Sequence, residues 1–243
     1  AQLWLEQLPA GRIFTAVSIA LRNLLAGDEP DAAAERANPF VDWIGALIRA
    51  DAYGWAHPGD PATAARLAVV DARLTHRRAG VHGAACMAGA AAAAVAGATP
   101  AEAIDAGLAC VPDRSRLADA VRLGRDLAAS DLDDEAAVDV LHERYGDLHW
   151  VHVLHNAAVV AFAAIRGADD LARAVGIAVA AGWDTDSVGA TVGGLVGAQG
   201  RSAVPAHLAD PVHGVYRTTL AGFDGIAFDD LAARTLALAQ VPA

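Results

Sequence analysis

Two carboxylates and a hydroxyl stand almost side by side in the segment 182–187. Asp184 and Asp186 are two residues apart and Ser187 follows directly, between a glycine turn and the start of a helix. Carboxylate and hydroxyl oxygens are hard ligands of the kind that Mg²⁺, Mn²⁺ and Ca²⁺ prefer. In a non-helical turn both carboxylates can point to the same side, so the segment predicts a divalent-cation site. The alternative is that Asp186 or Ser187 only caps the helix.

A group of histidines precedes this segment. His149, His152 and His155 follow one another at a spacing of three, with His142 upstream. That spacing gives a drifting stripe on one helix, whereas a zinc site usually pairs residues i and i+4 or draws on two elements. Core or pocket-lining roles are therefore favoured, with His155 and its neighbour Asn156 as pocket members, and zinc ligation is the alternative.

The composition excludes several functional classes. The chain has 243 residues, 55% of them hydrophobic, which is enough for a single domain over residues 1–243. Its net charge of −11 argues against direct nucleic-acid binding. All 18 basic residues are arginine. A Schiff-base lysine and a phosphate-binding lysine of the Walker type are therefore impossible.

The compartment is inferred from cysteine usage and from the lack of targeting signals. Cys86 and Cys110 lie in apolar, alanine-rich surroundings, which favours a reducing cytoplasm over a disulfide framework. The most apolar stretch, Ala84 to Ala98, is shorter than the ~20 residues that a bilayer requires, so we expect a buried helix and no membrane partner. The first six residues carry no basic region of a signal peptide. Since the chain also lacks an initiator methionine, we expect it to be a piece of something longer.

Helical periodicity runs through nearly the whole chain. We expect helices over residues 17–25, 40–53, 62–76, 82–97, 115–129, 134–145, 150–166, 168–181, 187–199 and 228–239, and one that begins at Pro100 after the N-cap Thr99. The segment 28–38 is predicted to be a polar loop, and no strand is expected. The predicted fold class is all-α, a compact multi-helix orthogonal array.

Glycines recur on one face of the helix that follows the acidic segment. Gly189, Gly193 and Gly197 are four residues apart. Each glycine costs a helix roughly 0.5–1 kcal/mol relative to alanine, so a stripe of them requires a packing reason or the close approach of a ligand. Close packing inside a soluble bundle is the favoured interpretation.

The segment from Gly182 to Gly200 resembles the C-terminal signature of the ADP-ribosylglycohydrolase family, which has an Asp-x-Asp-Thr motif in this position. Further segments that resemble one bacterial branch of the family are 38–51, 53–54, 74–76, 155–158 and 222–231. The resemblance therefore covers nearly the whole chain.

This resemblance implies an all-helical fold around a binuclear metal site, with two Mg²⁺ ions or sometimes Mn²⁺. It also implies hydrolysis of the N- or O-glycosidic bond at the anomeric carbon of ADP-ribose. Asp184, Asp186 and Ser187 would be the metal ligands, and Ser187 stands where the family usually has threonine. The residues implied to contact substrate are Arg49, Asp51, His76, His82, Gly83, Asn156 and Trp183.

Several of these residues also have non-catalytic interpretations. His76 alone is typical of a satisfied, partly buried histidine. Arg49 either contacts a phosphate or pairs with Asp51 or Asp42, because arginine is rarely buried without a partner. Trp183 either stacks on a base or fills the core.

The chain departs from the family at its start. The family begins with a helix that contains Gly-Asp and an acidic residue, and continues with a Thr-Asp-Asp ligand motif; neither occurs here. Asp133-Asp134 comes too late to be that motif and is expected to start a helix. The catalytic acid or base is therefore unknown and is expected in a segment before residue 1. A hydrolase of a related small N-glycoside and a catalytically silent ADP-ribose-binding module are the alternative functions.

Overall fold

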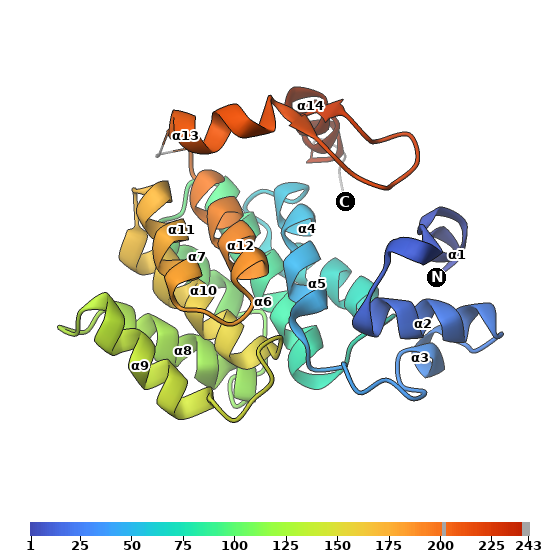
Figure 1. Ribbon diagram of the computed structural model, residues 1–243, viewed down its shortest axis with the longest axis horizontal. Helices are drawn as coiled ribbons and strands as arrows, with labels where there is room; N and C mark the ends of the chain where they lie inside the picture. Colours follow the sequence, from blue (N-terminus) through green and yellow to red (C-terminus); the bar gives the residue numbers. More distant parts are fainter. Residues whose placement is uncertain (201–202, 240–243) are drawn as a thin grey trace.

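The computed structural model describes residues 1–200 and 203–239, and these form an almost entirely helical fold, as predicted (Figure 1). The α-helices are α1 (Gln2–Gln7), α2 (Thr15–Leu25), α3 (Pro30–Ala33), α4 (Asp51–Trp55), α5 (Pro61–Ala72), α6 (Arg78–Val95), α7 (Pro100–Leu108), α8 (Arg116–Ala128), α9 (Asp134–Tyr145), α10 (Val153–Gly167), α11 (Leu171–Ala180), α12 (Thr185–Gly197), α13 (Ala206–Ala209) and α14 (Phe228–Ala239). Short 3₁₀ helices are η1 (Ala10–Arg12), η2 (Ile44–Arg49) and η3 (Asp210–Val212). Within the described residues, no helix is long and apolar enough to cross a bilayer.

Two helices form the centre of the body. α6 packs against α4, α5 and α7, while α10 packs against α8, α11 and α12. Small residues permit these close approaches, because a Cβ on Gly124 of α8 would collide with the carbonyl oxygen of Ala158 in α10. A methyl group there would force the two helices apart.

Helix starts agree with the capping signals in the sequence. Thr99 and Glu102 form a reciprocal capping box at the start of α7. Ser115 caps α8, and the Asp133 side chain accepts a hydrogen bond from the Ala136 N–H at the start of α9. Each cap satisfies a backbone N–H that has no partner inside its helix.

The prediction of one helix over residues 40–53 was wrong. The Ile44 N–H donates to the Val151 carbonyl at 2.9 Å, and the Val153 N–H donates to the Asp42 carbonyl at 3.0 Å. These bonds flank a bridge between Trp43 and His152, and residues 39–42 form a turn, so only η2 and α4 are helical. Smaller corrections are α3 inside the predicted loop and two two-residue strands, β1 (Val215–Tyr216) and β2 (Ile226–Ala227).

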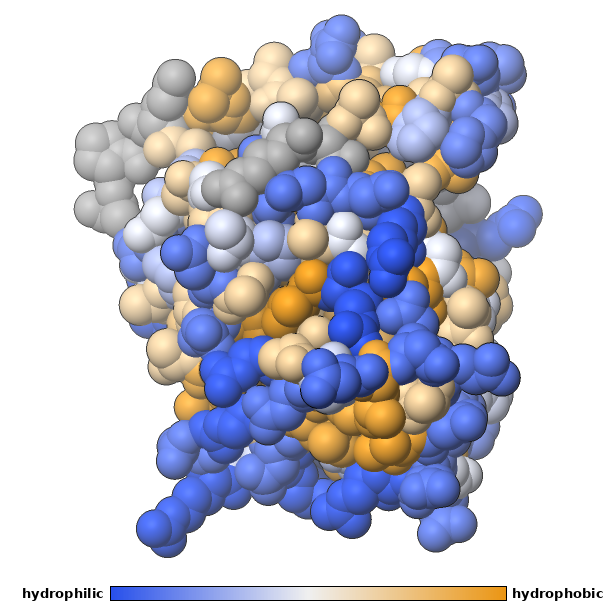
Figure 2. Space-filling view, turned by 90° about the vertical axis from the view of Figure 1, so that its left-hand side faces the viewer, coloured by the Kyte–Doolittle hydropathy of each residue, from blue (hydrophilic) through white to orange (hydrophobic). Residues whose placement is uncertain are grey.

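α12 is the element that positions both regions described below. It lies beside α10 and α11, and the segment from α13 to α14 crosses one end of the body (Figure 1). Its predicted glycine stripe faces α11, but only one of the three contacts is tight: a Cβ on Gly189 would lie 3.2 Å from Val179, whereas Cβ atoms on Gly193 and Gly197 would lie at ordinary distances of 3.6 Å from Val175 and 3.5 Å from Leu171. Figure 2 shows mainly hydrophilic side chains around a hydrophobic patch in the lower half of one face.

Candidate metal centre and neighbouring pockets

The acidic turn, residues 182–187, begins with two residues in the left-handed backbone region. Gly182 has φ +77° and Trp183 has φ +58°. Glycine adopts this conformation readily, whereas for a bulky residue such as tryptophan it is strained, on the order of 1–3 kcal/mol, and such strain gathers at functional sites. α12 then starts at Thr185, so its N-cap is Asp184, and the alternative that Asp186 or Ser187 is the N-cap is wrong.

Asp184 is a buried carboxylate that does not cap its helix. Its exposed fraction is 6%, and its side chain accepts no hydrogen bond from the N–H groups of α12. Burial raises the pKa of Asp184 to about 6, and the adjacent Asp186 carboxyl raises it too, whereas a hydrogen bond from Ser187 lowers it. The two carboxyls and the hydroxyl therefore share one small space, as predicted.

Asn156 joins this turn to the start of α10. It is fully buried, and its Oδ1 accepts a hydrogen bond from the Asp184 N–H at 3.3 Å. Its Nδ2 donates to the Trp150 and His152 carbonyls, both at 2.9 Å. Asn156 thereby fixes the backbone of Asp184 rather than facing an open pocket.

Trp183 packs against two imidazole rings. The ring centroids of His142 and Trp183 are 4.0 Å apart at an interplanar angle of 20°, and those of His155 and Trp183 are 4.3 Å apart at 31°. His142 Nε2 lies 2.9 Å from the Ala181 carbonyl oxygen, just before the turn. This geometry favours the core interpretation of Trp183 over stacking on a base.

The remaining histidines have separate structural roles. His152 caps α10, where its Nδ1 accepts from the Leu154 N–H at 3.2 Å, and His149 stacks on Trp43 with centroids 4.5 Å apart. His155 is fully buried, and burial lowers its pKa to about 4. Across residues 1–200 and 203–239, no group of three or more His, Cys, Asp or Glu side chains is placed to hold a metal ion.

Arg49 forms a second polar group, and its predicted partners were wrong. It pairs with Asp71 rather than Asp51 or Asp42, with Nε 2.6 Å from the Asp71 carboxylate. Its guanidinium also donates to the Gly45 carbonyl and to Thr75 Oγ1, both at 2.9 Å. Most of its donors are therefore used inside the protein.

His76 lies beside this group and is almost fully buried. Its Nδ1 is 2.6 Å from Thr75 Oγ1, and its Nε2 has no hydrogen-bond partner among the described residues. Burial, and then the nearby charge of Arg49, lower the pKa of His76 to about 3, so the ring is neutral at pH 7. A Cβ on Gly45 would lie 3.3 Å from His76 Cε1, so glycine leaves room for the ring.

His82 and Gly83, which the resemblance implies to contact substrate, lie in the first turns of α6. Gly83 is buried, and a Cβ there would lie 2.7 Å from Val153 Cγ2, so this glycine serves helix packing. His82 is half-buried, and burial lowers its pKa. No hydrogen bond between described residues joins His82, Arg49 or His76 to the acidic turn.

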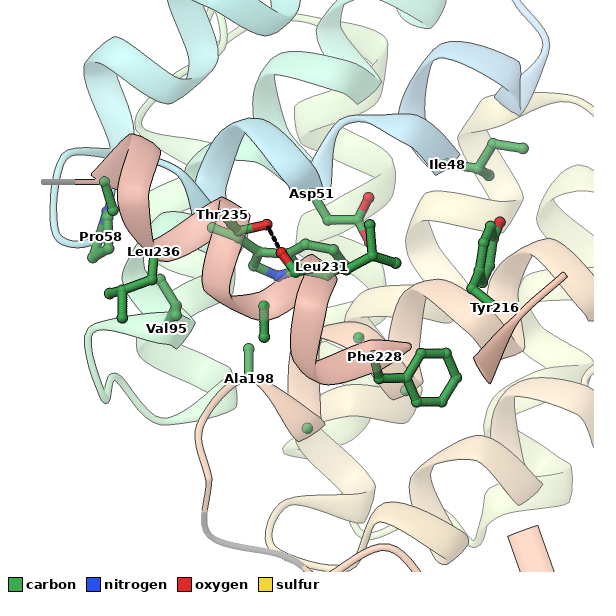
Figure 3. Close-up of a pocket in the computed structure, with 16 residues that line it drawn as sticks. Ile48, Asp51, Pro58, Val95, Ala198, Tyr216, Phe228, Leu231, Thr235 and Leu236 are labelled. Atoms are coloured by element: carbon green, nitrogen blue, oxygen red, sulfur yellow. Dashed lines mark hydrogen bonds between the residues drawn. The ribbon is translucent and has the colours of Figure 1, made fainter. Parts of the chain in front are cut away.

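Asp51 lies in a third place, at a cavity between α4, the C-terminal half of α12, and α14 (Figure 3). Burial raises the pKa of Asp51 to about 6, while hydrogen bonds from its own N–H and that of Ala52 oppose the increase. A Cβ on Gly194 would lie 3.2 Å from Asp51 Oδ2. The structure thus brings together Trp183, Asp184, Asp186, Ser187 and Asn156, while Arg49 and His76 form a separate group.

Sequence reasoning missed Asp71, Thr75 and the role of His142. Asp71 and Thr75 are four residues apart, a spacing typical of one helix face, which was a usable signal for a partner of Arg49. His142 comes from α9, and the sequence contains no local sign that its ring reaches Trp183.

The acidic turn has a donor set that fits a hard divalent cation. Two carboxylates and a hydroxyl supply oxygen ligands only, and Mg²⁺ commonly binds to one or two carboxylates while it keeps several waters. Two carboxylates held this close repel one another when both are ionised, and a cation removes that repulsion.

Comparison with known proteins gave one family. A family model described as ADP-ribosylglycohydrolase matches residues 2–241. No curated protein matches the chain. The matched range includes the acidic turn, the Arg49 group and the Asp51 cavity.

Proposed function

Because the chain belongs to the ADP-ribosylglycohydrolase family, and is thereby a glycosidic hydrolase of ADP-ribose linkages, we propose that its acidic turn binds a divalent cation, Mg²⁺ or Mn²⁺, and holds the ribose of an ADP-ribosylated substrate. The observation that carries this proposal is Asp184. It is a buried carboxylate that leaves its helix uncapped and shares its space with Asp186 and Ser187.

A cation bound at the turn supplies positive charge to ribose hydroxyls and water. Asp184, Asp186 and Ser187 fit one such ion, and a second ion, which the family resemblance implies, would need oxygen ligands beyond these three. We propose that the complete site contains both ions.

The surrounding residues keep the turn in one conformation. Asn156 fixes the Asp184 N–H, and the rings of His142 and His155 hold Trp183 in its strained conformation. Preorganised ligands of this kind lose less entropy when they bind. Arg49 acts indirectly in this proposal, because it anchors Gly45 and Thr75 around His76, whose Nε2 is buried and has no hydrogen-bond partner among the described residues.

We place this activity in the cytoplasm. Cys86 and Cys110 are free thiols, and burial raises the pKa of Cys86 to about 12, which keeps it unreactive. The test of this proposal is fractionation of the source cells followed by immunodetection, and recovery of the protein outside the cytoplasm would contradict it.

The test of function combines cation binding with product release. Mg²⁺ and Mn²⁺ are titrated calorimetrically into the wild type and Asp186→Ala, and ADP-ribose release is measured from modified arginine, serine and DNA, beside cleavage of nucleosides. We expect Asp186→Ala to weaken cation binding and hydrolysis by at least about 100-fold, since a lost ligand costs more than the 10–100-fold typical of an outer partner.

The control is Asp131→Ala, because Asp131 is exposed and lies in the bend between α8 and α9; it should match the wild type. Unchanged cation binding in Asp186→Ala would contradict the proposal. Nucleoside cleavage without ADP-ribose release would favour the small N-glycoside alternative, and ADP-ribose binding without release would favour the silent module.

A further inference from the structure

The cavity at the C-terminal half of α12 has a volume of about 780 Å³. This lies within the range of roughly 300–1,000 Å³ that is typical of small-molecule sites. Figure 3 shows Ile48 and Tyr216 at one end and Pro58 at the other, with Leu231 and Phe228 presented by α14. The walls are almost entirely apolar.

Among the described residues, Asp51 is the only charged one that lines this cavity. Within the described part of the chain, no arginine or histidine forms an ion pair with it. The α14 hydroxyl that lines the cavity, on Thr235, is already used, since it donates to the Leu231 carbonyl at 2.9 Å. A carboxylate on an apolar wall without a cation beside it is electrostatically incomplete.

The cavity is separate from the acidic turn. None of residues 182–187 lines it. Gly194, which faces Asp51, stands nine residues beyond Thr185, and that separation is about 13 Å along a helix. A ligand in this cavity therefore leaves the acidic turn free.

We propose that the cavity binds a small amphiphilic amine, with its positively charged nitrogen beside Asp51 and its apolar body along α14. Charge selects this class of ligand, because a carboxylate repels anions such as the pyrophosphate of ADP-ribose. A neutral polar ligand would leave the charge of Asp51 unpaired. The rings of Trp55, Tyr216 and Phe228 line the same space and attract cations as well as apolar groups.

The test uses three probes with the same phenylbutyl body: 4-phenylbutylamine, 4-phenylbutanol and 4-phenylbutyrate. Their binding to the wild-type chain is measured by calorimetry and by the fluorescence of the tryptophans, of which Trp55 lines the cavity. We expect the amine to bind at least about tenfold more tightly than the alcohol, the ratio expected when a hydrogen bond to a charged group is gained, and the acid to bind more weakly than both.

Two variants separate charge from space. Asp51→Asn removes the charge and should make the amine and the alcohol bind equally, while Ala232→Phe fills the cavity from α14 and should abolish binding of all three probes. Asp169→Asn, on the surface between α10 and α11, is the matched charge control and should retain the wild-type order. Equal binding of amine and alcohol by the wild type, or an amine preference that survives in Asp51→Asn, would overturn the proposal. This outcome is independent of the acidic turn, which Asp186→Ala tests.

Discussion

The N-terminal and C-terminal ends of α12 present two different kinds of site. At the N-terminal end, polar side chains are held by hydrogen bonds and ring stacks, and the backbone is in a left-handed conformation at Gly182 and Trp183. At the C-terminal end, the wall is apolar, and no residue of the covering helix α14 is buried. The side chains at the N-terminal end are held in one conformation, whereas α14 can shift its position over the cavity at the C-terminal end.

This difference predicts how each end responds to substitution. A tightly bonded, buried polar group loses several partners at once when it is truncated, so the acidic turn should be sensitive. The cavity wall at the C-terminal end is loosely covered and carries one unpaired carboxylate. Substitutions there should be tolerated, and removal of the charge should make the folded chain more stable. Placing both on one helix lets the same scaffold fix a reacting group at one end and accept a variable ligand at the other.

The largest effect is expected at Asn156. Replacing it with alanine removes the side-chain partner of the His152 carbonyl and of the Asp184 N–H, and leaves the Trp150 carbonyl with His155 Nε2 alone. We expect Asn156→Ala to lower the free energy of unfolding by about 2–3 kcal/mol. It should also weaken Mg²⁺ binding by about tenfold or more, because the Asp184 backbone is no longer fixed. Urea unfolding and calorimetric Mg²⁺ titration measure the two effects.

Asn23 provides the matched control. It is equally buried, and its Nδ2 donates to the Ala33 and Arg36 carbonyls, far from the acidic turn in the N-terminal part. Asn23→Ala should cost a similar free energy of unfolding and leave Mg²⁺ affinity unchanged. If both variants weaken Mg²⁺ binding equally, the special role of Asn156 at the turn is wrong.

Much of the fold could be predicted because its signals are local. Apolar periodicity and the caps at Thr99, Ser115 and Asp133 lie within the helices that they define. The start of the predicted helix 40–53 was wrong because the backbone groups of Asp42 and Ile44 bond to Val153 and Val151, and no local pattern reports such a distant pairing.

The candidate site also has parts with a local sequence signal and parts that depend on distant residues. The three oxygen donors of the acidic turn are neighbours in sequence, so residue types and spacing were enough to predict that they meet. The partner of Arg49 was missed because Asp71 lies 22 residues away. The cavity at Asp51 depends on α14, which reaches α4 from the far end of the chain.

The second-largest effect is expected at Asp51, where substitution should raise the free energy of unfolding rather than lower it. Burial raises its pKa from the ordinary value of 3.8 to about 6. A carboxyl with a higher pKa in the folded chain favours folding when protonated, so this stabilisation is present below pH 4 and is lost as the pH rises to about 6. Each pKa unit corresponds to about 1.4 kcal/mol, and partial solvation reduces the sum, so Asp51→Asn should raise the free energy of unfolding at pH 7.5 by about 1–2 kcal/mol.

Urea unfolding of wild type and Asp51→Asn at pH 4, 5, 6 and 7.5 measures this difference. The two chains should be closest in stability at pH 4 and diverge through pH 6. If Asp51→Asn is less stable than the wild type at pH 7.5, the Asp51 carboxylate has a stabilising partner in the folded chain. The proposed difference between the two ends of α12 would then be wrong.

The smallest effects come from one substitution made at each end. Gly182→Ala places a Cβ on a residue with φ +77°, where no heavy atom lies within 4 Å, so only the backbone opposes it, and we expect a loss of about 1 kcal/mol. Gly193→Ala adds a Cβ 3.6 Å from Val175 Cγ2, an ordinary contact inside a helix, and should gain about 0.5–1 kcal/mol.

Gly176→Ala calibrates this pair, because Gly176 is inside α11 and nothing lies within 4 Å of its Cβ position. Its gain is helix propensity alone. Thermal and urea unfolding of the three variants should therefore rank Gly182→Ala below the wild type, and Gly193→Ala and Gly176→Ala above it. A loss in Gly193→Ala as large as that in Gly182→Ala would mean that the C-terminal end of α12 is packed as rigidly as the acidic turn, since only an unyielding neighbour cancels the propensity gain.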